Sequence, residues 1–134
     1  MRDETKTWLR YGDENLQSAH VLLKSKLFNP CLQNVQQAVE KWLKALVVEL
    51  SMEPKKTHSI SELKGHCVRK GTQIDLSDDE CDLLDSIYLP SKYPLGGVLP
   101  DFEPNEEVCQ KSILIAERVR NSVAKCLDKK AKII

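Results

Sequence analysis

Apolar residues recur at intervals of three and four residues in three long stretches of the chain, which is the pattern of amphipathic helices. These helices are expected over about residues 3–27, 30–51 and 105–128. Their apolar faces are formed by Leu9, Leu16, Ala19, Leu23 and Leu27 in the first, by Leu32, Val35, Val39, Trp42, Leu43, Leu46 and Leu50 in the second, and by Cys109, Ile113, Ala116, Val119, Val123 and Leu127 in the third. The polar side of the second helix is expected to carry Gln33, Gln37, Glu40, Lys41 and Lys44.

Capping residues predict where the helices begin and end. Asn29 before Pro30 suits the N-cap and first position of the second long helix. Two shorter helices each begin with a capping box, in which serine is followed three residues later by glutamate. These pairs are Ser59 with Glu62, for a helix over about 59–70, and Ser77 with Glu80, for a helix that ends near Tyr88. Gly71 suits the position after the end of the first of them.

A long irregular loop is expected over about residues 89–104, because this stretch holds four prolines and the pair Gly96-Gly97. With three long helices, two short ones and no strand, the fold class is predicted to be all-α. The expected architecture is an up-and-down four-helix bundle with a short additional helix and this proline-rich loop before the last helix.

Composition limits the classes of function. The 134 residues suit a single helical domain over 1–134. Twenty basic residues balance twenty acidic ones, which argues against strong nucleic-acid binding. No membrane span or signal peptide is visible, so a cytoplasmic protein is predicted. The five cysteines are widely spaced without a C-x-x-C pair, so neither a disulfide framework nor a metal site is expected.

Charge is distributed unevenly along the chain. Residues 74–107 hold ten acids and one base, Lys92, whereas residues 55–70 are mainly basic. Two interpretations stay open: a polar cleft or partner surface, or a solvated surface whose acids cap helices.

Three segments carry a family resemblance. Residues 35–46 read Val-Gln-Gln-Ala-Val-Glu-Lys-Trp-Leu-Lys-Ala-Leu, residues 57–63 read Thr-His-Ser-Ile-Ser-Glu-Leu, and residues 88–94 read Tyr-Leu-Pro-Ser-Lys-Tyr-Pro. In this order and spacing they resemble the HEPN family, the "higher eukaryotes and prokaryotes nucleotide-binding" domain. The resemblance covers nearly the whole chain, from Trp8 to Val123.

The resemblance implies a four-helix bundle and several kinds of function. Some members pair with small nucleotidyltransferases, often in toxin–antitoxin modules, some are metal-independent ribonucleases, and others are nucleotide-binding modules of chaperone-like proteins. The ribonuclease branch is marked by R-x(4–6)-H, but no arginine precedes His20, His58 or His66 at that spacing. Ribonuclease activity is therefore not expected.

A ligand site is expected where the three segments meet, and ATP or GTP is its expected occupant, with no other cofactor. Its predicted residues are Gln37, Lys41, Lys44, His58, Tyr88, Lys92 and Tyr93. Lysines supply point charges for phosphate, and a tyrosine ring can stack on a base. Each residue also has a simpler interpretation, as solvated helix surface for the lysines and as a structural contact for His58 and the tyrosines.

The sequence thus favours a non-catalytic module that binds a nucleotide or a small nucleotidyltransferase. The alternative is a protein–protein interaction domain of a larger chaperone-like protein without a small-molecule ligand, and a divergent enzyme is a third hypothesis. A homodimer is expected at micromolar concentration, because Trp8, Trp42 and the wide face of the second helix offer surplus apolar area.

Overall fold

The computed structural model describes residues 1–50, 53, 56–92 and 103–133, and over these residues it contains five helices and no strand. The helices are α1 (Asp3–Lys24), α2 (Phe28–Glu49), α3 (Ile60–Arg69), α4 (Asp78–Lys92) and α5 (Glu106–Ile133). The all-α class is confirmed. The finer expectation of an up-and-down four-helix bundle stays a prediction, and most of the expected proline-rich loop lies outside the described residues.

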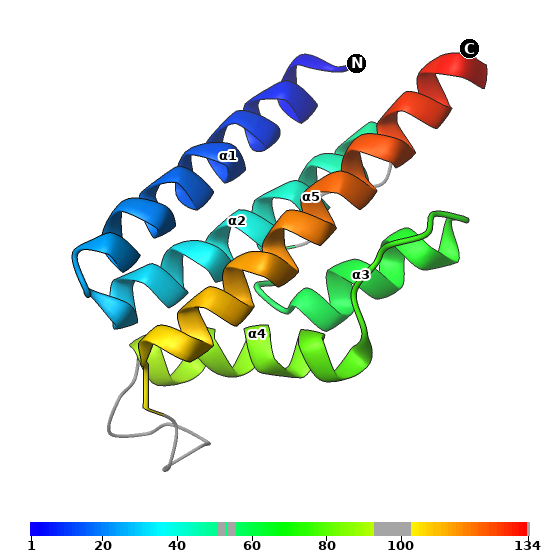
Figure 1. The fold of residues 1–134 in the computed structure, drawn as a ribbon. Helices are drawn as coiled ribbons and strands as arrows, with labels where there is room; N and C mark the ends of the chain where they lie inside the picture. Colours follow the sequence, from blue (N-terminus) through cyan, green and yellow to red (C-terminus); the bar gives the residue numbers. More distant parts are fainter. Residues whose placement is uncertain (51–52, 54–55, 93–102, 134) are drawn as a thin grey trace.

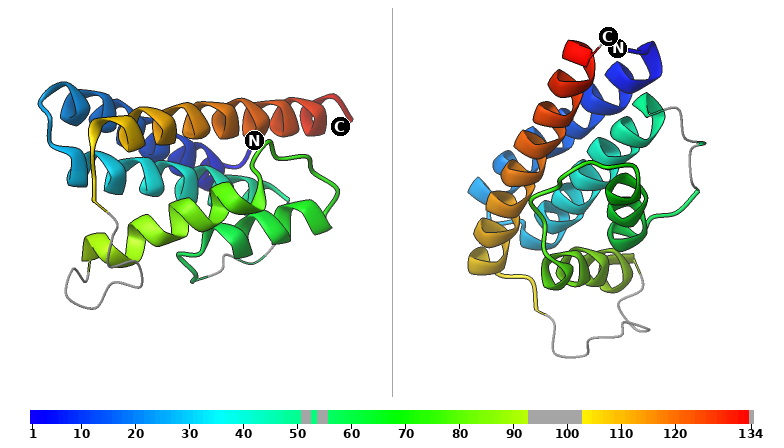
Figure 2. Two further views of the ribbon diagram at one scale, coloured as in Figure 1. Left: turned by 60° about the horizontal axis from the view of Figure 1, so that its bottom comes forward. Right: turned by 90° about the vertical axis from the view of Figure 1, so that its right-hand side faces the viewer.

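The long helices α1, α2 and α5 run side by side, and the shorter helices α3 and α4 lie on the other side of α2 (Figure 1). The two further views show the same arrangement, with α5 passing over α2 and both chain ends at one end of the molecule (Figure 2). Helix α2 contacts each of the other four helices. It is therefore the central element of the fold.

The core is built mainly from α2. Trp42 is fully buried, and its indole Nε1 donates a hydrogen bond of 2.9 Å to Asp13 of α1. Arg120 of α5 also bonds Asp13, at 2.8 Å, so one carboxylate links three helices. Gly12 faces the indole so closely that an added Cβ would lie 2.5 Å from Nε1. The six residues predicted for the apolar face of the last helix are all buried.

Hydrogen bonds confirm several of the predicted helix ends. Ser77 and Glu80 form a reciprocal capping box, with bonds of 3.0 and 3.1 Å. Ser59 caps α3 by accepting from the Glu62 N–H, but Glu62 does not return the bond, because the Ser59 N–H donates to Thr57 instead. After α3, Gly71 adopts a positive φ of 94° and ends the helix in a Schellman motif.

Other predicted ends were wrong. Helix α2 begins at Phe28 rather than at Pro30, because Lys26 takes a φ of 60° and reverses the chain there. Leu27 is consequently 50% exposed instead of lying on the apolar face of α1. Helix α4 continues through Pro90 to Lys92, where a loop was expected, with the proline in its last turn, so that only two further residues follow the hydrogen bond that Pro90 cannot donate. Helix α5 runs on to Ile133, because the lysines after Asp128 favour a helix C-terminus.

Candidate functional site

A buried carboxylate lies at the centre of the predicted site. Glu40 of α2 is only 3% exposed, although the helical pattern placed it on the polar side. Its Oε2 pairs with Lys44 Nζ at 2.9 Å, and its Oε1 lies 3.2 Å from His58 Nδ1. Gln36, also buried, donates to Glu40 Oε1 at 3.2 Å. Burial of Glu40 is tolerated because Lys44 neutralises its charge and Gln36 and His58 contact its Oε1 oxygen.

His58 is held in place on three sides. Besides the contact of Nδ1 with Glu40, its backbone carbonyl accepts a bond of 3.3 Å from the Gln36 side chain. Its ring stacks on Tyr88 of α4, with centroids 4.9 Å apart and planes inclined by 16°. Half of the imidazole stays in contact with solvent. In the neutral imidazole with its proton on Nδ1, that nitrogen donates to Glu40 and Nε2 is an acceptor.

The start of α3 lies beside this histidine and is already occupied by a carboxylate. Asp85 of α4 accepts the Ile60 N–H at 2.6 Å, the Ser61 N–H at 3.3 Å and the Ser59 hydroxyl at 3.3 Å. These are the amides that a helix N-terminus would offer to a phosphate. Asp85 thus fills that position from within the chain.

The structure brings together part of the predicted site. Lys44, His58 and Tyr88 are joined through Glu40 and the ring stack, and Gln37 is linked to them by a 2.9 Å bond to Gln36. Lys41 turns toward α1, where its ammonium donates to Asn15 at 2.7 Å. Lys92 is the last residue of α4, and its side chain is not among those described. Tyr93 lies outside the described residues.

The charges of this cluster balance internally. The Lys44 side chain is 13% exposed, and its ammonium pairs with Glu40 and lies 5.5 Å from the centre of the Trp8 ring. With Glu40 and Asp85 opposite Lys44 and Lys41, the described part of the site has no excess of positive charge. No cluster of three or more His, Cys, Asp or Glu side chains in the described part of the chain could hold a metal ion.

Three important residues of the cluster were missed from the sequence: Gln36, Glu40 and Asp85. Gln36 and Glu40 stand one turn apart in the very segment that carries the resemblance, which was the available signal. No sequence signal pointed to Asp85. Its bonds to the start of α3 join residues 24 to 26 positions apart, so they depend on how α3 and α4 pack.

The comparisons with known proteins cover most of the chain. The HEPN domain family matches residues 5–127. A crystal structure of TT1696 from Thermus thermophilus is similar with a TM-score of 0.75 and 21% identity, covering 92% of this chain and 98% of that one. A crystal structure of ST0689, an archaeal HEPN homologue, has a TM-score of 0.69 and 25% identity, covering 93% and 98%. No curated protein matches the chain. No helix in the described ranges is long and apolar enough to cross a membrane.

Proposed function

Since this chain belongs to the HEPN domain family, we propose that it is a non-catalytic binding module that engages a protein partner of the small nucleotidyltransferase type. The contact surface would be formed by the exposed edge of His58, by Tyr88 and by the neighbouring start of α3. The absence of an R-x(4–6)-H arrangement around all three histidines supports a non-catalytic role. The five cysteines are free, which suits a location in the reducing cytoplasm.

One observation favours a protein partner over a free nucleotide: Glu40 neutralises Lys44, the predicted phosphate-binding lysine that lies beside His58. A triphosphate carries nearly four negative charges, which several uncompensated cations would have to match. Lys44 is paired, Lys41 is bonded to Asn15, and Asp85 occupies the amides of α3. What the surface does offer is a fixed imidazole and a tyrosine ring, which suit hydrogen bonding and packing against a protein.

Nucleotide binding is the second candidate, and one feature of α4 favours it. The helix continues to Lys92, which places this lysine one turn beyond Tyr88. A nucleotide could therefore meet a cation and an aromatic ring from the same helix.

Calorimetry with ATP and GTP separates the two candidates. We expect binding weaker than about 1 mM, unchanged in the double variant Lys41→Ala with Lys92→Ala. Micromolar binding that these substitutions abolish would contradict the protein-partner proposal and establish the nucleotide one.

The partner itself is tested by co-purification with a small nucleotidyltransferase. We expect a complex that His58→Ala weakens at least about tenfold, whereas His20→Ala, an exposed histidine on α1, leaves it intact. Thermal unfolding of both variants controls for folding. A complex indifferent to His58 would exclude this surface, and robust cleavage of single-stranded RNA lost in His58→Ala would overturn the non-catalytic role.

A further inference from the structure

A cavity that shares no residue with the cluster around Glu40 lies beside the end of α2 and the C-terminal half of α5. It has a volume of about 870 Å³ and is lined by Leu50, the segment 71–75 and four residues of α5: Ser122, Lys125, Cys126 and Lys129. Sites for small organic molecules typically have volumes of about 300–1,000 Å³. No segment of the family resemblance contributes to this cavity.

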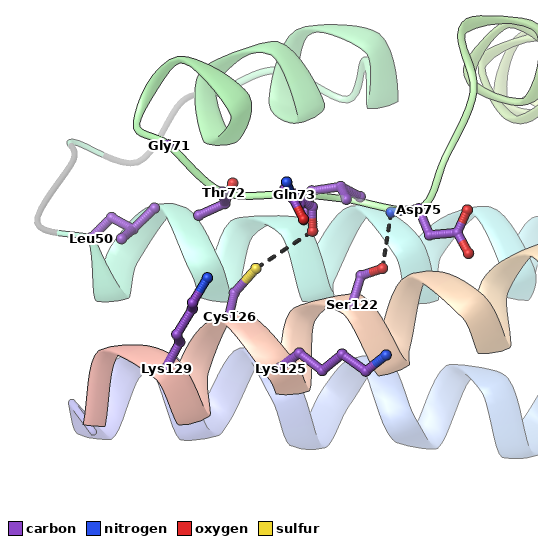
Figure 3. Close-up of a pocket in the computed structure, with 10 residues that line it drawn as sticks. Leu50, Gly71, Thr72, Gln73, Asp75, Ser122, Lys125, Cys126 and Lys129 are labelled. Carbon is purple, nitrogen blue, oxygen red and sulfur yellow. Dashed lines mark hydrogen bonds between the residues drawn. The ribbon is translucent and has the colours of Figure 1, made fainter. Parts of the chain in front are cut away.

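The wall opposite α5 is a fixed extended segment. The Asp75 N–H donates to Ser122 Oγ at 2.9 Å, and Cys126 Sγ donates to the Gln73 carbonyl at 3.6 Å (Figure 3). At its start, the Thr72 hydroxyl donates to the Cys67 carbonyl at 2.6 Å. Gly71 faces open space, with no atom within 4 Å of where a Cβ would lie. These bonds fix the segment to α5 on one side and to the end of α3 on the other, so this wall of the cavity has a defined position.

The lining combines apolar and cationic side chains. Leu50, Ile74 and Cys126 are each half-buried, so they present apolar surface to the cavity. Lys125 and Lys129 are exposed, and neither is paired with a carboxylate among the described residues. In Figure 3, Lys129 extends from α5 toward the space between Leu50 and Cys126, whereas Lys125 extends along α5 in the other direction. The acid of the lining, Asp75, is paired with Arg118 at 3.2 Å.

We propose that this cavity binds a small organic anion with an apolar body, such as a monocarboxylate. The carboxylate would pair with Lys129, with the exposed Lys125 side chain as a second cation after a change of rotamer, and the hydrocarbon part would cover Leu50, Ile74 and Cys126. Covering this apolar surface removes it from water, which supplies affinity that an inorganic anion could not gain. The proposal goes beyond the partner-binding role and involves none of its residues.

Cys126 provides a specific reporter of occupancy. The other four cysteines are buried, and burial raises the pKa of Cys67 and Cys109 to about 12, that of Cys81 to about 11, and that of Cys31 above its usual value. Those thiols are poor nucleophiles at neutral pH, so N-ethylmaleimide should modify Cys126 first in the folded protein.

The test titrates the intact chain with octanoate and follows the backbone amide shifts of residues 71–75 and the alkylation rate of Cys126. We expect a dissociation constant on the order of 0.1–1 mM and slower alkylation at saturation. Octan-1-ol, which has a similar apolar chain without the charge, should bind at least about tenfold more weakly, as should inorganic phosphate.

Variants locate the charge that recognises the anion. Lys125→Gln with Lys129→Gln should weaken octanoate about tenfold, whereas the matched double variant Lys6→Gln with Lys111→Gln, at exposed positions outside the cavity, should change binding less than twofold. Equal losses in both variants, equal binding of octan-1-ol or phosphate, or unprotected Cys126 would each overturn the proposal. Since these readouts involve neither His58 nor a protein partner, their outcome is independent of the partner experiments.

Discussion

Buried Glu40 stabilises the fold through its contacts with Lys44, His58 and Gln36. Replacing Glu40 by alanine leaves the charge of Lys44 without its carboxylate partner and removes the contact of the carboxylate with His58 Nδ1. Removing one member of a fully buried ion pair costs about 3–5 kcal/mol. Because Lys44 and His58 both reach solvent, we expect a smaller loss, about 2 kcal/mol in the free energy of unfolding, measured with urea.

Two variants serve as comparisons for this loss. Glu40→Gln retains the shape and the bond from Gln36, so we expect an intermediate value. Glu14→Ala removes an exposed acid of α1 and should change stability by less than about 0.5 kcal/mol. If Glu40→Ala lowered the free energy of unfolding no more than Glu14→Ala, the buried cluster would not contribute to stability.

Two helical glycines should respond to the same substitution with opposite signs. In Gly12→Ala the new methyl would lie 2.5 Å from the indole nitrogen of Trp42, which is fully buried and bonded to Asp13. We expect a loss of about 2–3 kcal/mol from overpacking. In Gly65→Ala the nearest atom is in the Arg69 guanidinium, at 3.2 Å, which is the far end of a long, exposed side chain that can move aside.

Gly65→Ala should therefore gain about 0.5–1 kcal/mol from helix propensity. The melting temperatures of the two single variants, recorded by circular dichroism, provide the comparison. Destabilisation of equal size in both would mean that α1 and α2 do not approach each other as closely as Gly12 and Trp42 indicate.

At the scale of the elements, the start of α4 is sensitive to acid. Glu80 is partly desolvated, which raises its pKa, but bonds from Ser77 and Arg118 outweigh this effect and hold the pKa below its usual value of 4.5. A carboxylate with a lowered folded-state pKa adds stability that is complete above the unfolded pKa and is lost as the pH falls through the folded one. Stability should thus decline below about pH 4.5 partly through Glu80.

Glu80→Gln should make that decline shallower, as measured by urea unfolding between pH 3 and 6 in roughly half-unit steps. Glu107→Gln, at an exposed position in the first turn of α5, serves as the control and should leave the pH profile unchanged. Identical slopes for the wild type and Glu80→Gln would show that the bonds from Ser77 and Arg118 do not lower the pKa of Glu80 in solution.

The sequence predicted these elements well where a helix has one buried side. Every residue expected on the apolar face of α5 is buried, because a long helix on the outside of the molecule separates its two sides cleanly. Helix α2 is enclosed on several sides, so its pattern could not show that Glu40 points inward. The bond from Ile60 to Asp85 and the cavity beside Cys126 depend on packing between distant segments, which periodicity does not encode.

For the whole molecule, self-association stays a prediction, but most of the surface first expected to mediate it packs inside the chain. Trp42 and the apolar face of α2 are buried within the chain itself. The large apolar side chains that remain exposed on α1 and α5 include Val21, at 61%, and Leu114, at 63%. We now propose that a homodimer would form through these two helices.

Sedimentation equilibrium at a concentration on the order of 100 µM tests this proposal. We expect twice the chain mass of 15.3 kDa for the wild type and a monomer for Leu114→Lys. Val68→Lys, which alters an exposed apolar residue on α3, should leave the dimer intact. A wild type found only at 15.3 kDa would refute dimerisation at this concentration.

The central position of α2 has a consequence for the motions of the protein. Amide hydrogens exchange with solvent only when the surrounding structure opens, and slow exchange marks the segments that open last. Helix α2 is covered by α1, α5, α3 and α4, so local fraying of any one neighbour still leaves it enclosed by the others. Its amides should exchange only through global unfolding, whereas those of α3, a helix of 10 residues, should exchange through partial openings that leave the rest of the fold intact.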